Sequence, residues 1–93
     1  MAKKLCVNIS MFDFNQDVFM TDGEIIKHVA SVPMERLSEI IYSLTGTEDG
    51  IEEIEINGNQ EYIQPVGYEI LEGLNKLYSD KNVRVYLNGE VFN

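Results

Sequence analysis

A strand–helix–strand pattern in the second half of the chain limits the possible folds more than any other feature. The run IEEIEIN at residues 51–57 alternates apolar and polar side chains, and VRVYLNG at residues 83–89 does the same, as half-buried strands do. Apolar residues between the two runs follow a helical spacing: Val66, Ile70, Leu71, Leu74, Leu77 and Tyr78. Because two parallel strands need a crossover between them, this order predicts a right-handed parallel βαβ unit.

The start of the chain predicts a hairpin. Residues 4–12 alternate in the same way, and residues 18–21 can return as a second short strand after a polar turn at 13–17. One face of the first strand would carry Leu5, Val7, Ile9 and Met11. We therefore expect an antiparallel pair before the βαβ unit.

Two helices are predicted between the hairpin and the βαβ unit. Thr21 and Glu24 form a capping-box pattern that indicates a helix at 22–30, and an amphipathic stripe that ends at Gly46 indicates another at 33–45. The pair resembles a helix-turn-helix unit. Its second helix carries a single base among acids, so we do not expect it to read DNA.

Together these elements predict one acidic α/β domain over residues 1–93. The expected fold is a two-layer sandwich, in which a mixed sheet of three or four strands (the hairpin plus the parallel βαβ unit) has about three helices on one face. The inward face of the sheet would carry Leu5, Val7, Ile9, Ile54, Ile56, Val83, Val85 and Leu87. The opposite, polar face would carry Asn8, Ser10, Glu53, Glu55, Asn57, Arg84, Tyr86 and Asn88.

The net charge restricts the partners. Sixteen acidic against seven basic residues leave a charge of −9, which disfavours direct binding to nucleic acid or to anionic membranes. No apolar run approaches the ~18–20 residues that a membrane span needs, and no signal peptide is visible, so we expect a cytoplasmic protein without membrane contact. The abundance of Ile, Asn and Glu, with only two Ala, suggests an AT-rich genome, either bacterial or phage.

The loop GNQEYIQPVG at residues 58–67 lies between the predicted strand and helix. It lacks the glycine spacing and the lysine of phosphate-binding loops, and Glu61 would repel a phosphate, so we expect no nucleotide or other cofactor there. Pro65 predicts that the regular helix begins close to it. Residues 59–63 would then form a separate projecting turn that displays Glu61 and Tyr62.

Residues 51–89 resemble the STAS-type domains of anti-sigma-factor antagonists and anion transporters, which share the order strand, loop, helix, strand. The resemblance implies a STAS-like fold. The antagonists carry a phosphorylated serine after an aspartate in this loop, whereas the matching stretch here is IQPVG, without either residue. The resemblance therefore does not imply a phosphorylation switch.

Catalytic or metal-binding chemistry has little support. His28 is the only histidine and Cys6 the only cysteine, which excludes an intramolecular disulfide and a cysteine-based zinc cluster. The acids Glu48, Asp49, Glu52, Glu53 and Glu55 lie along one turn and one strand without the spacing of a calcium loop. We expect them to be solvated, and we expect no metal.

We therefore predict a small, non-enzymatic protein-binding or regulatory protein that docks on a basic surface of a partner, for example a nucleic-acid-binding protein. One hypothesis places it in a phage or mobile element. The residues predicted to contact the partner are Glu53, Glu55, Asn57, Glu61, Tyr62, Arg84 and Tyr86. Two alternatives remain open: a self-associating structural subunit, such as a homodimer formed through the polar sheet face or the free edge of the last strand, and a small enzyme with a cleft around His28 and Cys6.

Overall fold

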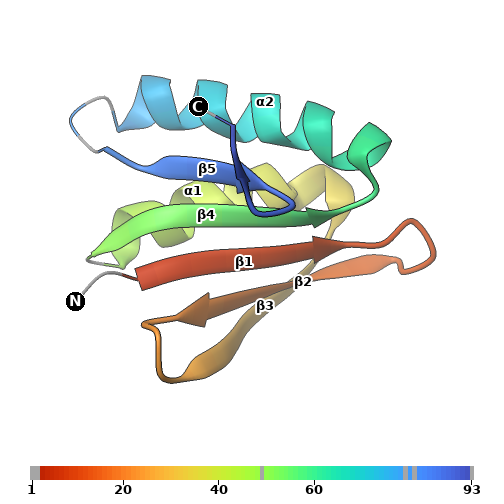
Figure 1. The fold of residues 1–93 in the computed structure, drawn as a ribbon, viewed down its shortest axis with the longest axis horizontal. Helices are drawn as coiled ribbons and strands as arrows, with labels where there is room; N and C mark the ends of the chain where they lie inside the picture. The colour runs from red at the N-terminus through yellow and green to blue at the C-terminus, as the bar shows by residue number, and fades with distance from the viewer. Residues whose placement is uncertain (1–2, 49, 79, 81, 93) are drawn as a thin grey trace.

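The sheet in the computed structural model has six strands in the order β3-β2-β1-β4-β5-β6 (Figure 1). The structure describes residues 3–48, 50–78, 80 and 82–92. The strands are β1 (Lys3–Ile9), β2 (Asn15–Thr21), β3 (Ile26–Pro33), β4 (Ile51–Gly58), β5 (Arg84–Leu87) and β6 (Glu90–Val91). The helices are a short 3-10 turn η1 (Met34–Arg36), α1 (Leu37–Thr47) and α2 (Gln60–Leu77).

The hairpin and the parallel βαβ unit are confirmed, and the structure adds a pairing of β1 with β4 that the sequence did not predict. β1 and β2 form an antiparallel hairpin, β4 and β5 are parallel across α2, and β4 also pairs in parallel with β1. Both α-helices lie on the same side of the sheet, where the core forms (Figure 1). Every residue predicted for the inward face is buried, and Ile63 and Ile70 of α2 and Leu37 and Ile41 of α1 complete the core.

The prediction of a helix at 22–30 is wrong, which makes the sheet larger than expected: six strands and two α-helices instead of three or four strands and three helices. Asp22 and Gly23 form the turn of a hairpin, and residues 26–33 pair with β2. Asp22 Oδ1 accepts hydrogen bonds from the N–H groups of Glu24 and Ile25, at 3.1 and 3.2 Å. These bonds hold the pKa of Asp22 below its ordinary value. Because Thr21 pairs with Ile26, the turn has four residues, 22–25, and Gly23 in it has a φ of 102°. These turn residues outweigh the capping-box pattern.

A second hairpin follows β5, which the sequence reasoning did not predict. Asn88 and Gly89 have φ angles of 51° and 83°, the left-handed region in which Asn and Gly are the best-tolerated residues. Their turn returns the chain so that β6 pairs with Tyr86 and Leu87. The last predicted strand is therefore covered by β6 along part of its outer edge, and β3 is the long free edge of the sheet.

Helix α2 begins earlier than Pro65 predicted. Its N-cap is Asn59, whose side-chain oxygen accepts a hydrogen bond from the N–H of Glu61 at 3.0 Å. Residues 59–63 are thus no separate turn, and Pro65 lies inside the helix, where it has no N–H to donate to the carbonyl of Glu61. Ile63, in this first part of the helix, is fully buried, so the early start adds an apolar side chain to the core.

The helix termini bring two smaller corrections. Leu77, predicted to be buried, is 59% exposed near the end of α2. Helix α1 follows the predicted stripe and buries Leu37 and Ile41, but it continues past Gly46 to Thr47.

Candidate protein-binding surfaces

The side of the sheet opposite α1 and α2, here called the open sheet face, carries side chains in rows that cross the strands. The strand registers define a first row Thr21–Lys4–Glu53–Arg84 and a third row Asp17–Asn8–Asn57. The middle row is the longest: His28–Phe19–Cys6–Glu55–Tyr86–Val91. Five of the predicted contact residues, Glu53, Glu55, Asn57, Arg84 and Tyr86, lie in these rows.

Two carboxylates of the open sheet face lie next to basic residues. Lys4 Nζ lies 3.3 Å from Glu55 Oε2, and Glu53 is directly opposite Arg84 in the β4–β5 register. Burial by itself would lower the pKa of Lys4, but its hydrogen bond to Glu55 and the nearby carboxylates outweigh burial, and the pKa is raised. The carboxylates of this face therefore lie beside bases, which the alternating sequence pattern did not indicate.

Two aromatic residues lie on either side of the charged centre of this face. Phe19 of β2 and Tyr86 of β5 are both half-buried, although no helix covers them. The ring of Phe19 meets the ring of His28 edge-on, with centroids 5.2 Å apart, and His28 Nε2 lies 3.0 Å from Asp17 Oδ1. These contacts hold Phe19 in place on the outer side of β2.

Cys6 and His28 do not form a pair. Phe19 lies between them in the middle row, so they are two strands, or roughly 10 Å, apart. Burial raises the pKa of Cys6, while the nearby Lys4 only partly opposes this effect. The Cys6 Sγ is 4.0 Å from Glu55 Oε2, and the imidazole of His28 is engaged with Asp17.

The other two predicted contact residues, Glu61 and Tyr62, lie elsewhere. They belong to the first turn of α2, at the end of the sheet where β1 and β4 finish. Glu61 is exposed and Tyr62 is 41% exposed. The seven predicted residues are therefore divided between the open sheet face and the start of α2.

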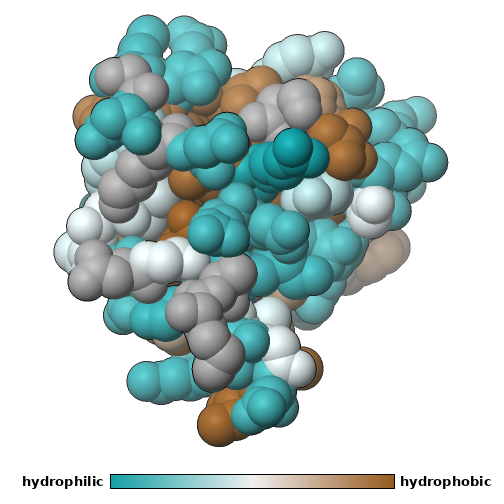
Figure 2. All heavy atoms as spheres, turned by 60° about the vertical axis from the view of Figure 1, so that its left-hand side comes forward, coloured by the Kyte–Doolittle hydropathy of each residue, from teal (hydrophilic) through white to brown (hydrophobic). Residues whose placement is uncertain are grey.

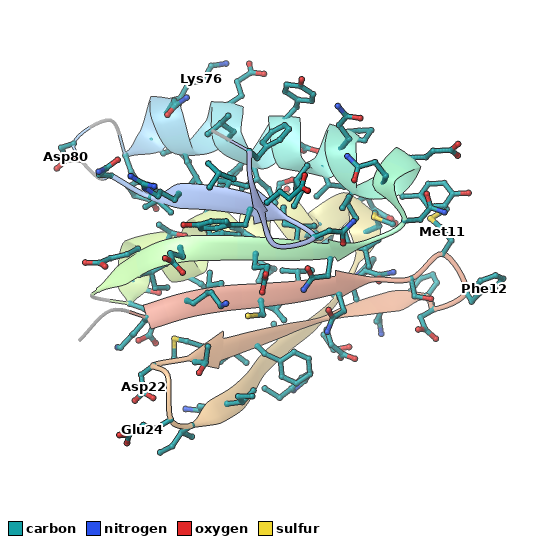
Figure 3. The ribbon with its side chains drawn as sticks, in the orientation of Figure 1. Met11, Phe12, Asp22, Glu24, Lys76 and Asp80 are labelled. Atoms are coloured by element: carbon teal, nitrogen blue, oxygen red, sulfur yellow. The ribbon has the colours of Figure 1, made fainter. Side chains whose placement is uncertain are left out.

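The β1–β2 loop at the same end of the molecule displays apolar side chains that the sequence reasoning missed. Phe12 is fully exposed, Phe14 is 81% exposed and Met11 is 53% exposed. Figure 3 shows Met11 and Phe12 projecting from this loop. Met11 was predicted on the same face of the first strand as Leu5, Val7 and Ile9, but β1 ends at Ile9, so the alternation of the strand does not reach it. The available signal was the pair of phenylalanines flanking Asp13 in a predicted polar turn.

This loop and the turn before α1 border a shallow hollow of about 410 Å³ that is open to solvent, here called the hairpin hollow. Its apolar lining comes from Met11, Phe12, Phe14 and Met34, and its carboxylates come from Asp13 and Glu35. The volume is within the ~300–1,000 Å³ range of ordinary binding pockets.

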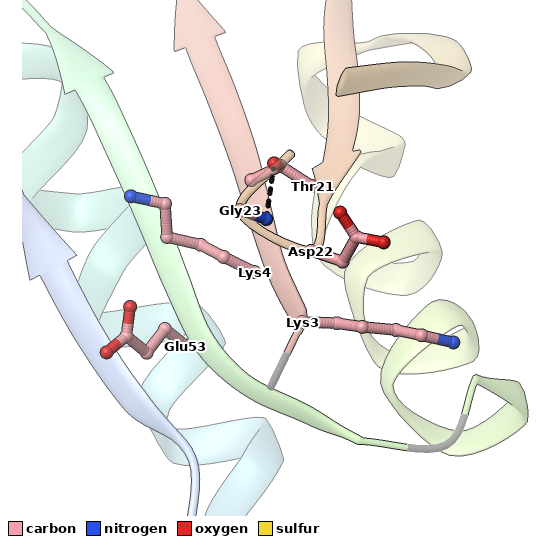
Figure 4. A pocket seen from close by; sticks show the side chains of 6 residues that line it. All are labelled: Lys3, Lys4, Thr21, Asp22, Gly23 and Glu53. Atoms are coloured by element: carbon pink, nitrogen blue, oxygen red, sulfur yellow. Dashed lines mark hydrogen bonds between the residues drawn. The ribbon is translucent and has the colours of Figure 1, made fainter. Parts of the chain in front are cut away.

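The opposite end of the molecule is more polar. Figure 2 brings this end forward and shows a surface that is mainly hydrophilic, with small separate apolar patches. A hollow of about 260 Å³ lies here between β1, β4 and the β2–β3 turn, lined by Lys3, Lys4, Thr21, Asp22, Gly23 and Glu53 (Figure 4). Its two lysines already have carboxylate partners, Glu48 for Lys3 at 3.5 Å and Glu55 for Lys4.

The acidic run around β4 is dispersed. Glu52 is exposed, whereas Glu53 and Glu55 lie on the open sheet face; Asp49 is outside the described residues. In the described part of the chain, no three His, Cys, Asp or Glu side chains are grouped in a way that could hold a metal ion. Among those same residues, no helix has the length and apolar character that crossing a membrane requires.

No protein-family model, curated protein or solved structure matches this chain. The likeness of residues 51–89 to STAS-type domains therefore rests on the βαβ pattern alone. That pattern occurs in many unrelated proteins and carries no function by itself.

Proposed function

We propose that this chain is a small, non-enzymatic protein-binding module that docks a protein partner on its open sheet face. The observation that carries the proposal is the position of both described α-helices on one side of the sheet, so that neither packs over the half-buried Phe19 and Tyr86 on the other side. Tyr and Phe are enriched at protein interfaces, because they bring a large contact area with little loss of conformational freedom.

The dimensions of the molecule support a partner of ordinary size. It measures 34 × 28 × 23 Å, so a face in the plane of the two longer axes offers as much area as the ~800 Å² that each partner buries in a standard interface. The open sheet face is also built on strands of one sheet, so a partner would meet a surface that needs little ordering.

The charge supports a basic partner. The net charge of −9 would speed the approach of a positively charged protein and would repel acidic ones. Within the face, Glu55 is paired with Lys4 and Glu53 is opposite Arg84, so the carboxylates are suited to exchange their internal partners for those of a bound protein.

Affinity capture with two double variants of equal charge tests the proposal. Glu53→Lys with Glu55→Lys reverses two charges on the open sheet face, and Glu69→Lys with Glu72→Lys makes the same change on the exposed side of α2. We expect the first double variant to lose partners that the second retains, in an extract of the source cells at ~150 mM salt, near physiological ionic strength. Equal capture by both would contradict docking on this face.

Self-association along β3 is the second candidate, because this strand is the long free edge of the sheet and its Ile26 is 74% exposed. Three features oppose it: Lys27, Pro33 and the irregular register opposite Val18 and Phe19 all discourage edge-to-edge pairing. Light scattering over a range of concentrations decides between the two. A dimer that Ile26→Lys dissociates would favour the structural-subunit alternative.

A further inference from the structure

We infer that the hairpin hollow is a second docking site, and that its occupant is an apolar side chain carried by a Lys- or Arg-rich segment of a protein partner. The inference rests on the proposed function, protein binding, but it concerns a surface at the end of the sheet instead of the open sheet face. The two surfaces share no described lining residue.

Three apolar side chains of the hollow are largely exposed to solvent. A fully exposed Phe12 next to an 81% exposed Phe14 leaves two large aromatic surfaces in water within one short loop. Contiguous apolar groups of this kind mark interaction sites on soluble proteins. Met11 and Met34 add flexible thioether side chains, which adapt to the shape of an inserted group.

The loop is held in shape from below by a buried glutamine. Gln16, only 2% exposed, accepts a 2.8 Å hydrogen bond from the N–H of Ser10 through Oε1. Its Nε2 donates to the carbonyl oxygens of Ser10 and Asp13, at 2.9 and 3.1 Å. The loop therefore displays Phe12 and Phe14 in one backbone conformation without a partner, which lowers the entropy lost on binding.

The negative charge around the hollow favours basic residues on either side of the apolar side chain that binds in it. Asp13 and Glu35 line the hollow. Arg36 follows Glu35 in the chain, but it pairs with Glu39, with Arg36 Nε 3.7 Å from Glu39 Oε2. The other described bases lie away from this end: Lys3, Lys4 and Arg84 at the far ends of their strands, Lys27 beside Met20, and Lys76 in the last turn of α2. Figure 3 shows Lys76 at the opposite end from Met11 and Phe12. An apolar site with an acidic rim complements an apolar residue between bases.

A two-dimensional NMR titration of the whole chain with synthetic peptides tests the inference. The probe is a peptide with one leucine between pairs of lysines. Two control peptides replace the leucine by serine or the lysines by glutamates. We expect the probe to shift the amide signals of residues 10–16 and 34–35, and we expect the control peptides to shift them little.

Two protein variants make the test specific. Phe12→Ser removes a side chain that contacts mostly solvent, so the protein should stay folded and bind the probe roughly tenfold more weakly, as loss of a binding hot spot predicts. Leu77→Ser removes an exposed apolar side chain at the end of α2 and should bind like the unchanged protein.

Three results would overturn the inference. One is equal binding of the probe and the control peptides, or binding that Phe12→Ser does not weaken. Another is a shift of the same signals with protein concentration alone, which would assign the hollow to a second copy of this chain. The third is a response to phosphatidylcholine vesicles in place of the peptide. Shifts confined to the open sheet face would reject this site while leaving the proposed function standing.

Discussion

Tyr42 of α1 lies directly over Gly73 of α2, and its hydroxyl donates a 2.6 Å hydrogen bond to the carbonyl of Glu69. A second contact of the same kind, between a tyrosine and a glycine, joins the two helical segments near Gly46. Tyr78 occupies the space over Gly46 and donates a 2.8 Å hydrogen bond to the carbonyl of Tyr42. The two helices are therefore fixed to each other as one layer, on one side of the sheet.

Gly73→Ala should destabilise the protein, although alanine favours helices over glycine by ~1 kcal/mol. A Cβ at this position would collide with the ring and hydroxyl of Tyr42, so we expect a net loss of about 1–3 kcal/mol, as for other overpacked sites. Urea unfolding measures the change. Asn75→Ala, at an exposed position of the same helix, is the control and should cost nothing. A Gly73→Ala protein as stable as the original would contradict the contact.

Gly58→Ala should be more costly than Gly23→Ala. Both glycines have positive φ angles, 151° and 102°, so both changes strain the backbone. Only at Gly58 would the new Cβ also meet other atoms, 2.7 Å from the carbonyl oxygen of Ile9 and 3.0 Å from Ile63 Cγ2. We expect about 1–2 kcal/mol for Gly23→Ala and at least ~2 kcal/mol for Gly58→Ala in thermal or urea unfolding. The reverse order would contradict the close approach of Gly58 to Ile9 and Ile63.

Gln16→Ala should loosen the β1–β2 loop. The change leaves the N–H and carbonyl of Ser10 without their side-chain partner, and we expect a loss of about 1–3 kcal/mol in unfolding free energy. Hydrogen exchange of the Ser10 amide should become faster, and the affinity for the basic peptide should fall even though no lining aromatic is changed. Asn15→Ala, at the exposed neighbouring position, is the control. Unchanged exchange at Ser10 would mean that Gln16 does not order the loop.

Cys6 should react slowly with thiol reagents at neutral pH. Burial raises its pKa above the ~8.5 of a free cysteine, so the thiolate fraction is smaller than that of glutathione. The reaction rate should rise about tenfold per pH unit from neutral pH upward, and it should not level off until the pH is above that ordinary value. By the same shift, the neutral thiol favours the folded state up to the unfolded pKa, and this stabilisation is lost as the pH rises through the folded pKa. A Cys6 that reacts faster than glutathione at pH 7 would favour the enzyme alternative.

The alternating strands were predictable because their period is strict and one of their faces is buried. Leu5, Ile54 and Val85 occupy the core, and Glu55 and Tyr86 the open sheet face, as the pattern required. The pairing of β4 with β5 followed from the need for a crossover, which is a property of the chain connection and not of single residues.

The errors occurred where two local signals competed. Residues 22–30 offered both a capping box and an Asp-Gly turn, and apolar residues such as Ile26 and Val29 suit either a helix or a strand. Residues 26–33 form a strand because they pair with the edge of β2. That pairing depends on the position of β2 in the fold, which the local sequence does not specify. Pro65 similarly argued for a late helix start, but the Asn59 cap and the buried Ile63 extend the helix to Gln60.

The candidate surfaces were predictable only in part. Alternation predicted the polar residues of the open sheet face but not the ion pair between Lys4 and Glu55. These two residues are 51 positions apart in the sequence, and they meet because β1 and β4 are neighbours in the sheet. The hairpin hollow brings Met34 next to Phe14 across the β2–β3 hairpin, a contact that depends on the strand at 26–33. The sequence does not indicate this arrangement, because its capping-box pattern predicts a helix at 22–30.

Site-specific photo-crosslinking tests the central claim, protein binding through the open sheet face, most directly. A photoreactive phenylalanine analogue would replace Tyr86 on that face, Phe12 at the hairpin hollow or the 59% exposed Tyr68 on α2, in separate samples of the whole chain. After illumination in an extract of the source cells, we predict a discrete protein adduct from position 86 that position 68 does not give. Position 12 reports separately on the hairpin hollow. Adducts that are absent at position 86, or identical at 86 and 68, would contradict the claim.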